Sequence, residues 1–97
     1  MYAVVRRYKG ASAVAIFDEV TRRQADVEKL IRGVPGFAAY YVVRSGEIVS
    51  SITVCQDQAG TAESNRVAAE WIRANVPAEA GSPPEITEGE VTIHFGP

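Results

Sequence analysis

The 97-residue sequence contains a single cysteine, Cys55, so it cannot form an internal disulfide. Small secreted domains commonly depend on several disulfides, and we therefore expect a reducing, cytoplasmic location. No run approaches the ~20 apolar residues that a membrane-spanning helix needs. Arg6, Arg7 and Lys9 interrupt the only apolar run near the beginning. We expect neither a signal peptide nor a membrane partner.

Basic residues are scarce in the second half of the chain. Residues 51–97 contain two Lys or Arg against seven Asp or Glu, whereas residues 1–50 contain eight against five. The basic residues are scattered rather than gathered into a patch with aromatic side chains, so we do not expect a nucleic-acid partner. No group of His, Cys and carboxylates has metal-ligand spacing, and no glycine-rich phosphate loop is present. The sequence predicts no metal and no cofactor.

The order of predicted elements is strand, helix, strand, strand, helix, strand. β-branched and aromatic residues predict strands over residues 2–8, 36–44, 47–55 and 87–96. Apolar positions at helical spacing predict one amphipathic helix of about five turns over 13–32, ended by Gly33, and a second helix within 56–77. Thr61 is the predicted N-cap of the second helix, and Ser45-Gly46 the predicted hairpin turn.

This order is the ferredoxin-like βαββαβ sandwich, an α+β fold. Right-handed crossovers place both helices on one face of a four-stranded antiparallel sheet, with the strands in the spatial order 4-1-3-2. We expect residues 1–97 to form a single domain.

The second predicted strand has no polar face. In "GFAAYYVV", residues 36–43, Phe37 and Tyr41 are assigned to one side and Tyr40 and Val42 to the other. One side of such a sheet is covered by the helices, and an apolar second side is a liability unless something covers it. We therefore expect a homodimer formed through the sheet face opposite the helices. Which of Tyr40 and Tyr41 faces the helices stays open, as does the choice between Arg6 and Arg7.

The length, the element order and the segments "VPGFAAYYV" and "AAEWIRANVP" resemble the antibiotic biosynthesis monooxygenase-like family of the dimeric α+β barrel superfamily. The resemblance implies homodimers whose sheets pack face to face, with a pocket in each subunit between its helices and its own sheet. It also implies a range of activities, because some members are cofactor-independent monooxygenases of phenolic polyketides and others degrade haem.

Haem degradation is disfavoured within that resemblance. A haem-degrading member has an asparagine in the first strand and a haem-ligating histidine near the second helix. This chain has Arg6 and Arg7 in its first strand, and its only histidine, His94, lies in the last predicted strand. The monooxygenase members hold an aromatic substrate with Asn, Trp, Tyr and Arg side chains, and the substrate's own enolate reacts with dioxygen.

The candidate substrate-binding residues are Trp71, Asn75, Phe17, Tyr41 and Arg6, and no catalytic residue is assigned. Trp71 and Asn75 are four residues apart and share a helix face, whereas Asn65 lies about 120° around the helix from Trp71. A core role for Trp71 and a helix-end role for Asn75 is the competing interpretation. An open cavity of a few hundred Å³ beside Trp71 would favour ligand binding, and one filled by Phe17, Phe37 and Trp71 would count against an enzyme.

Cys55 and His94 do not form a predicted catalytic pair, because the strand order separates them by about 9–10 Å. Cys55 is expected to act as a small hydrophobe. His94, with Thr92 and Glu90, is expected on the intersubunit side of the sheet.

Two functions are consistent with the sequence. The first is monooxygenase-like, cofactor-independent oxidation of a small aromatic or phenolic compound in a pocket between sheet and helices. The second is a non-catalytic homodimer that binds a small molecule or is purely structural.

Overall fold

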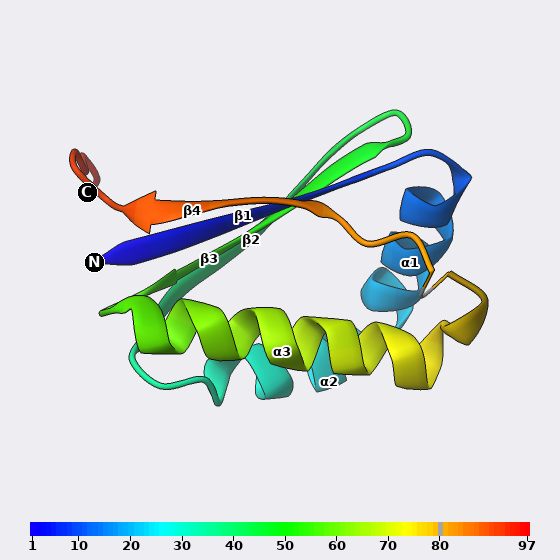
Figure 1. The fold of residues 1–97 in the computed structure, drawn as a ribbon, viewed down its shortest axis with the longest axis horizontal. Helices are drawn as coiled ribbons and strands as arrows, with labels where there is room; N and C mark the ends of the chain where they lie inside the picture. The colour runs from blue at the N-terminus through cyan, green and yellow to red at the C-terminus, as the bar shows by residue number, and fades with distance from the viewer. Residues whose placement is uncertain (80) are drawn as a thin grey trace.

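The computed structural model describes residues 1–79 and 81–97. Four strands and three α-helices follow the chain in the order β1 (Tyr2–Lys9), α1 (Ala11–Arg22), α2 (Gln24–Arg32), β2 (Phe37–Ser45), β3 (Ile48–Cys55), α3 (Gln58–Asn75), a short 3-10 turn (Pro77–Glu79) and β4 (Glu85–Glu90). The sheet is antiparallel with the strand order β2-β3-β1-β4, and the helices lie against one of its faces (Figure 1). The predicted ferredoxin-like architecture and strand order are confirmed.

The two faces of the sheet differ in what covers them. On the helix-covered face, β1 contributes Val4, Arg6 and Tyr8, which are all buried. The open face carries apolar side chains as well, and those of Tyr41 and Val43 are more than half exposed. The open face is therefore apolar in part, as expected, whereas the helix-covered face also carries the buried polar residues Arg6, Ser51 and Thr53.

A β-bulge in β2 determines which of Tyr40 and Tyr41 faces the helices. Phe37 pairs with Cys55, but the register shifts before Ala39 pairs with Val54. Because of this extra residue, Phe37 and Tyr40 share the helix-covered face, whereas Tyr41 lies on the open face. The predicted grouping of Phe37 with Tyr41 was wrong, because strict alternation cannot anticipate a bulge.

The predicted first helix is two helices, and the prediction of one continuous helix was wrong. Arg23 leaves the helical conformation between α1 and α2, with φ −111° and ψ 34°. Just before the break, the Thr21 hydroxyl donates to the carbonyl of Phe17, a bond that bends helices. The break lets α1 and α2 bury different side chains. Ile16 and Phe17 of α1 pack in one core cluster, and Val27 and Ile31 of α2 in another.

The positions predicted for the hairpin turn and for the N-cap of the second helix were wrong. The hairpin turn is Gly46-Glu47 rather than Ser45-Gly46, since Ser45 already pairs with Ile48. Gly46 has φ +60°, and a positive φ at only the first central residue matches a type II′ turn. The N-cap of α3 is Asp57, whose carboxylate accepts from the amide of Ala59, and not Thr61, which is buried in the helix.

The last strand ends earlier than predicted. β4 pairs with β1 as far as Glu90, opposite Tyr2, and the only further main-chain bond in the described part of the chain runs from the Val91 amide to the Met1 carbonyl. Residues 91–97 are consequently in no strand, although their sequence pattern is that of one.

Candidate functional site

Arg6 is the most deeply buried charged residue of the structure, with 1% of its surface exposed. It projects from the middle of β1 toward the helices, and its guanidinium donates four hydrogen bonds. Nε donates to the Ser51 hydroxyl at 3.0 Å and Nη2 to the Thr53 hydroxyl at 2.6 Å, both on β3. Nη1 donates to the Ser64 hydroxyl at 3.0 Å and to Oδ1 of Asn65 at 2.8 Å, both on α3.

All four acceptors are neutral. Within residues 1–79 and 81–97, no carboxylate lies within ion-pair distance of Arg6. Burial lowers the pKa of the Arg6 guanidinium, but arginine stays protonated in proteins. A buried charge is costly unless it is paired. Hydrogen bonds to hydroxyl and amide oxygens offset part of that cost but do not neutralise the charge. Arg6 is therefore a fixed positive charge that would favour an anion beside it.

The close approach of α3 to the sheet brings its acceptors to Arg6. Gly60 sits so near the end of β3 that a Cβ built there would lie 2.1 Å from the Pro35 carbonyl oxygen and 2.8 Å from Sγ of Cys55. Glycine thus allows the first turns of α3 to lie directly on β3. Thr61, the next residue, and Ser64, about one turn further, are fully buried as a result.

Asn65 is oriented by Arg6. Its Oδ1 accepts from the guanidinium, so its Nδ2 amide group points to the other side of the side chain. No acceptor among the described residues is bonded to that Nδ2. A cavity of about 200 Å³ is lined by Arg6, Tyr8 and Asn65, and the charged residues Arg73 and Glu79 also line it. The Glu79 carboxylate accepts a hydrogen bond from the Ser12 hydroxyl. Four of the five N–H groups of the Arg6 guanidinium are engaged, so one Nη2 N–H of Arg6 and the Nδ2 group of Asn65 remain as donors at this cavity.

Tyr8 and Tyr40 flank the arginine as neutral phenols. Burial raises the pKa of both hydroxyls, and the nearby Arg6 charge opposes that rise without cancelling it. Both tyrosines are therefore protonated at neutral pH. They can donate hydrogen bonds but do not serve as bases, and they do not supply the negative charge that Arg6 lacks.

Trp71 and Phe17 lie in packed core rather than beside an open pocket. Phe17 packs edge-on against Tyr8 with 5.0 Å between ring centroids, and Trp71 packs against the same cluster. The space that Trp71 lines has a volume of only about 30 Å³. This is little more than room for one water molecule. The filled cavity was the outcome expected to count against an enzyme, although Phe37 lies outside it, and the open space is instead found beside Arg6.

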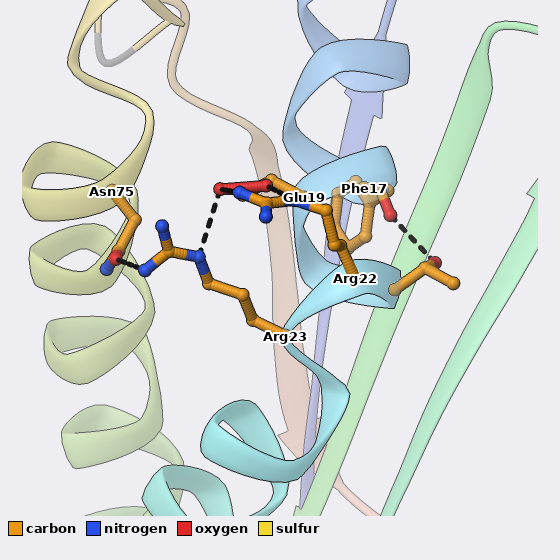
Figure 2. A network of polar contacts seen from close by, with 6 residues as sticks. Phe17, Glu19, Arg22, Arg23 and Asn75 are labelled. Atoms are coloured by element: carbon orange, nitrogen blue, oxygen red, sulfur yellow. Dashed lines mark hydrogen bonds and ion pairs between the residues drawn. The ribbon is translucent and has the colours of Figure 1, made fainter.

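Asn75 joins the end of α3 to the break between α1 and α2. Its Nδ2 donates to the Trp71 carbonyl at 2.9 Å, and its Oδ1 accepts from Arg23 at 2.8 Å. Figure 2 shows Arg23 lying between Asn75 and Glu19, with its Nε 3.0 Å from a Glu19 carboxylate oxygen. Both polar atoms of Asn75 are engaged within the fold, which favours its helix-end role over ligand contact.

Tyr41 lies on the open face, away from Arg6, but at the edge of a second hollow. This groove of about 560 Å³ runs between β2 and the helices α1 and α2, and Val20, Val27, Phe37, Tyr40 and Val42 line it as well. Of the five candidate substrate-binding residues, only Arg6 lines the 200 Å³ cavity, and only Tyr41 lines the 560 Å³ groove.

The cysteine and the histidine do not lie together in one site. Cys55 is fully buried, and burial raises the pKa of its thiol, so it is an unreactive core residue. His94 is exposed beyond the end of β4. The face expected for its neighbour Glu90 was wrong, because Glu90 pairs with Tyr2 on the helix-covered side. No cluster of three or more His, Cys, Asp or Glu suited to a metal ion occurs in the described parts of the chain.

Four site residues were missed by the sequence analysis as members of one cluster: Ser51, Thr53, Ser64 and Asn65. A signal existed on β3, because Ser51 and Thr53 lie on the same face of this strand. The predicted strand order places that strand beside the one that carries Arg6. Nothing in the spacing along the second helix identified Ser64, since its contact with the sheet depends on Gly60.

The fold resembles solved structures along nearly its whole length, and oxygenases are among them. A protein of unknown function from Nitrosomonas europaea aligns with a TM-score of 0.72 and 20% identity, covering 99% of this chain and 93% of that one. A monooxygenase of Streptomyces coelicolor in complex with nanaomycin D gives 0.69 and 16%, covering 99% and 91%. An asparagine-to-alanine variant of SnoaB, a cofactor-independent oxygenase from Streptomyces nogalater, gives 0.64 and 20%, covering 97% and 95%.

No family model matches the chain, and no curated protein sequence matches it. The structural matches show that the chain shares the fold of these oxygenases and of a putative antibiotic biosynthesis monooxygenase from Chloroflexus aurantiacus, which is the fold that the resemblance implied. At these identities they establish the fold alone. Among the helices of residues 1–79 and 81–97, none has the length and apolar character needed to cross a membrane.

Proposed function

We propose that this protein binds a small phenolic compound as its anion beside Arg6 and oxidises it with dioxygen without a cofactor. The observation that carries the proposal is the buried, uncompensated guanidinium at the wall of a cavity. A phenolate oxygen in that cavity would bring to Arg6 a negative charge closer than the Glu79 carboxylate, which lines the cavity but is not within ion-pair distance of the guanidinium. The shared fold with a cofactor-independent oxygenase supports the same chemistry but does not define the substrate.

The size of the cavity limits the substrate. About 200 Å³ is below the ~300–1,000 Å³ of common ligand pockets, so the site suits a single aromatic ring rather than a fused polycyclic compound. Arg6 would lower the pKa of the bound phenol, because a nearby opposite charge favours the ionised form. The Nδ2 group of Asn65 and the neutral Tyr8 hydroxyl are donors available to the same ligand.

The proposed reaction takes its electrons from the substrate. The phenolate ring carbon forms a bond to dioxygen, and with one proton this gives a ring hydroperoxide. The O–O bond then breaks, the ring hydrogen leaves as a proton, and the products are a quinone and water. Arg6 stabilises the negative charge of the bound phenolate and then the negative charge that develops on oxygen during the reaction. This is the role of an oxyanion site.

A thermal-shift panel followed by oxygen uptake tests this function. We expect hydroquinones and simple phenols to raise the melting temperature, and flavin and haem to leave it unchanged. The Arg6→Met variant should lose the shift, whereas Arg7→Met, which changes the exposed neighbour on the other face, should keep it. Oxygen consumption with quinone formation must accompany binding; stabilisation by haem alone would contradict the proposal.

A non-catalytic binding protein is the second candidate function. The packed space beside Trp71 counts against an enzyme, because no cavity of ligand size among the described residues adjoins the residue most suited to hold an aromatic substrate. Ligand-induced stabilisation without any oxygen uptake would identify this second function. The two candidates therefore share the Arg6 site and differ in turnover.

The assembly proposed for either function is a homodimer through the open face of the sheet. Val5, Ile52 and Val54 form the half-buried centre of that face, and Tyr41 and Val43 are exposed beside them. A second sheet packed on this face would bury all of them. Light scattering should give the mass of two chains at micromolar concentration, and the mass of one chain would contradict this assembly.

A further inference from the structure

Two residues of opposite charge line the cavity that Arg6 lines. Arg73 belongs to the last turn of α3, and Glu79 ends the short 3-10 turn that follows this helix. This turn lies beside α1 (Figure 1). Arg73 is exposed and Glu79 is half-buried, whereas Arg6 is fully buried. The cavity therefore has a buried positive end and a mouth that carries one charge of each sign.

The two charges at the mouth are not paired with each other. Within residues 1–79 and 81–97, no carboxylate lies within ion-pair distance of Arg73. One oxygen of Glu79, Oε2, accepts from the Ser12 hydroxyl at 2.7 Å. That bond orients the carboxylate, and the second oxygen keeps its capacity to accept. Arg73 and Glu79 can each contact a ligand group of opposite charge.

The spacing along α3 matches the length of a substituted phenol. Asn65, beside Arg6, and Arg73 are about two turns, or about 12 Å, apart along the helix axis. Ala68 and Ala69 line the cavity between them, and their small side chains leave room for a ring. A 4-hydroxyphenyl ring with a short side chain, with one hydrogen bond at each end, spans a comparable length. A phenol held at Arg6 therefore directs its para substituent toward the mouth.

The charges of the cavity select what that substituent carries. Among the described lining residues, two arginines stand against one glutamate, which leaves a net charge of +1. A phenolate that carries both a carboxylate and an ammonium group has the complementary net charge and offers a partner to all three residues. A carboxylate alone would bring a second negative charge toward Glu79, and an ammonium group alone would leave Arg73 without a partner.

We infer that the ligand of the Arg6 site is a free phenolic α-amino acid. Its phenolate lies beside Arg6, its carboxylate pairs with Arg73 and its ammonium group pairs with Glu79. The inference rests on the proposed phenolate site at Arg6, and it holds whether or not the ligand is oxidised. Only a free amino acid carries both charges on one carbon, so the same phenol within a peptide lacks the groups that this mouth recognises.

Calorimetry with compounds that share one ring tests the inference: 4-ethylphenol, tyramine, 3-(4-hydroxyphenyl)propionate and the two enantiomers of tyrosine. We expect one enantiomer of tyrosine to bind tightest, about tenfold or more tighter than 4-ethylphenol, because it adds two charged contacts. Equal affinities for tyrosine and 4-ethylphenol, or tightest binding of tyramine or the propionate, would overturn the inference and leave the phenolate site standing. Absence of binding by every compound would overturn both.

Two variants that each remove one charge assign the contacts. Arg73→Gln should weaken tyrosine and the propionate about tenfold and leave tyramine unchanged, whereas Glu79→Gln should weaken tyrosine and tyramine and leave the propionate unchanged. Glutamine at position 79 keeps an acceptor for the Ser12 hydroxyl. Arg66→Gln is the matched control, because that guanidinium is engaged by two glutamates of the same helix. A preference for tyrosine over 4-ethylphenol that persists unchanged in both variants would contradict the inference.

Discussion

Arg6 and Asn65, on β1 and α3, are joined by a 2.8 Å hydrogen bond from Nη1 to Oδ1 that fixes the asparagine amide beside a cavity. The bond explains how a strand residue and a helix residue, 59 positions apart, form one site. It also links charge to orientation, since the same guanidinium that would attract an anion turns the Nδ2 group of Asn65 away from itself.

The Arg6→Met variant distinguishes a functional arginine from a structural one. Replacing Arg6 with methionine removes the cost of burying an unpaired charge but leaves the four oxygens that accept from it without that donor. Because these two effects oppose each other, we expect the free energy of unfolding to change by less than about 1.5 kcal/mol. Urea denaturation measures it. A loss of roughly 3 kcal/mol or more would mean that Arg6 serves the fold.

Stability should fall in alkaline solution through Tyr8 and Tyr40. Burial raises the pKa of both hydroxyls above the value of about 10 in the unfolded chain. The folded state therefore binds the phenolic protons more tightly. This contribution is fully present below pH ~10 and is lost as pH rises through the folded-state values. Unfolding midpoints of wild type and Tyr8→Phe, measured between pH 8 and about 11.5, should fall less steeply with pH in the variant; identical slopes would contradict this assignment.

Gly60→Ala should destabilise the fold and loosen the site. The added methyl would overlap the Pro35 carbonyl and the Cys55 side chain, so α3 must move off the sheet. Such overpacking costs about 1–3 kcal/mol. Gly89→Ala is the matched control, because a Cβ there meets nothing within 4 Å. Equal urea midpoints for the two variants would show that the close approach is unimportant.

Asn75→Ala should reduce stability without affecting ligand binding. Both polar atoms of Asn75 are engaged, with Arg23 and with the Trp71 carbonyl, so the variant loses about 0.5–1.5 kcal/mol per hydrogen bond at most. Affinity for a phenol should stay within twofold of wild type. A tenfold loss of affinity would contradict this expectation and show that Asn75 takes part in ligand binding.

The architecture follows from the sequence because it depends on patterns that repeat along each element. Alternation on β1 and β3 and helical spacing in α3 were sufficient for the element order and the sheet topology. Failures occurred where one residue breaks a pattern. The β2 bulge reversed the relation of Phe37 to Tyr41, and the break at Arg23 divided a helix whose apolar spacing is continuous.

The site was less accessible from sequence than the fold. Trp71 and Asn75 share a helix face. Packing with Phe17 closes the space beside Trp71, and hydrogen bonds engage the side chain of Asn75. Arg6 was identified as a candidate, yet its partners on α3 depend on how closely that helix approaches the sheet. This distance is set by Gly60 in three dimensions and leaves no periodic signal.

The ionisation of bound 4-nitrophenol tests the central claim most directly, because its phenolate is coloured and its pKa can be read in the complex. If Arg6 binds the phenolate, the pKa of the bound phenol should be lower than in water by about 1 unit or more in wild type and in Arg7→Met, and unshifted in Arg6→Met. A bound phenol whose pKa is unchanged or raised in wild type, or no saturable binding at millimolar concentration, would contradict the account.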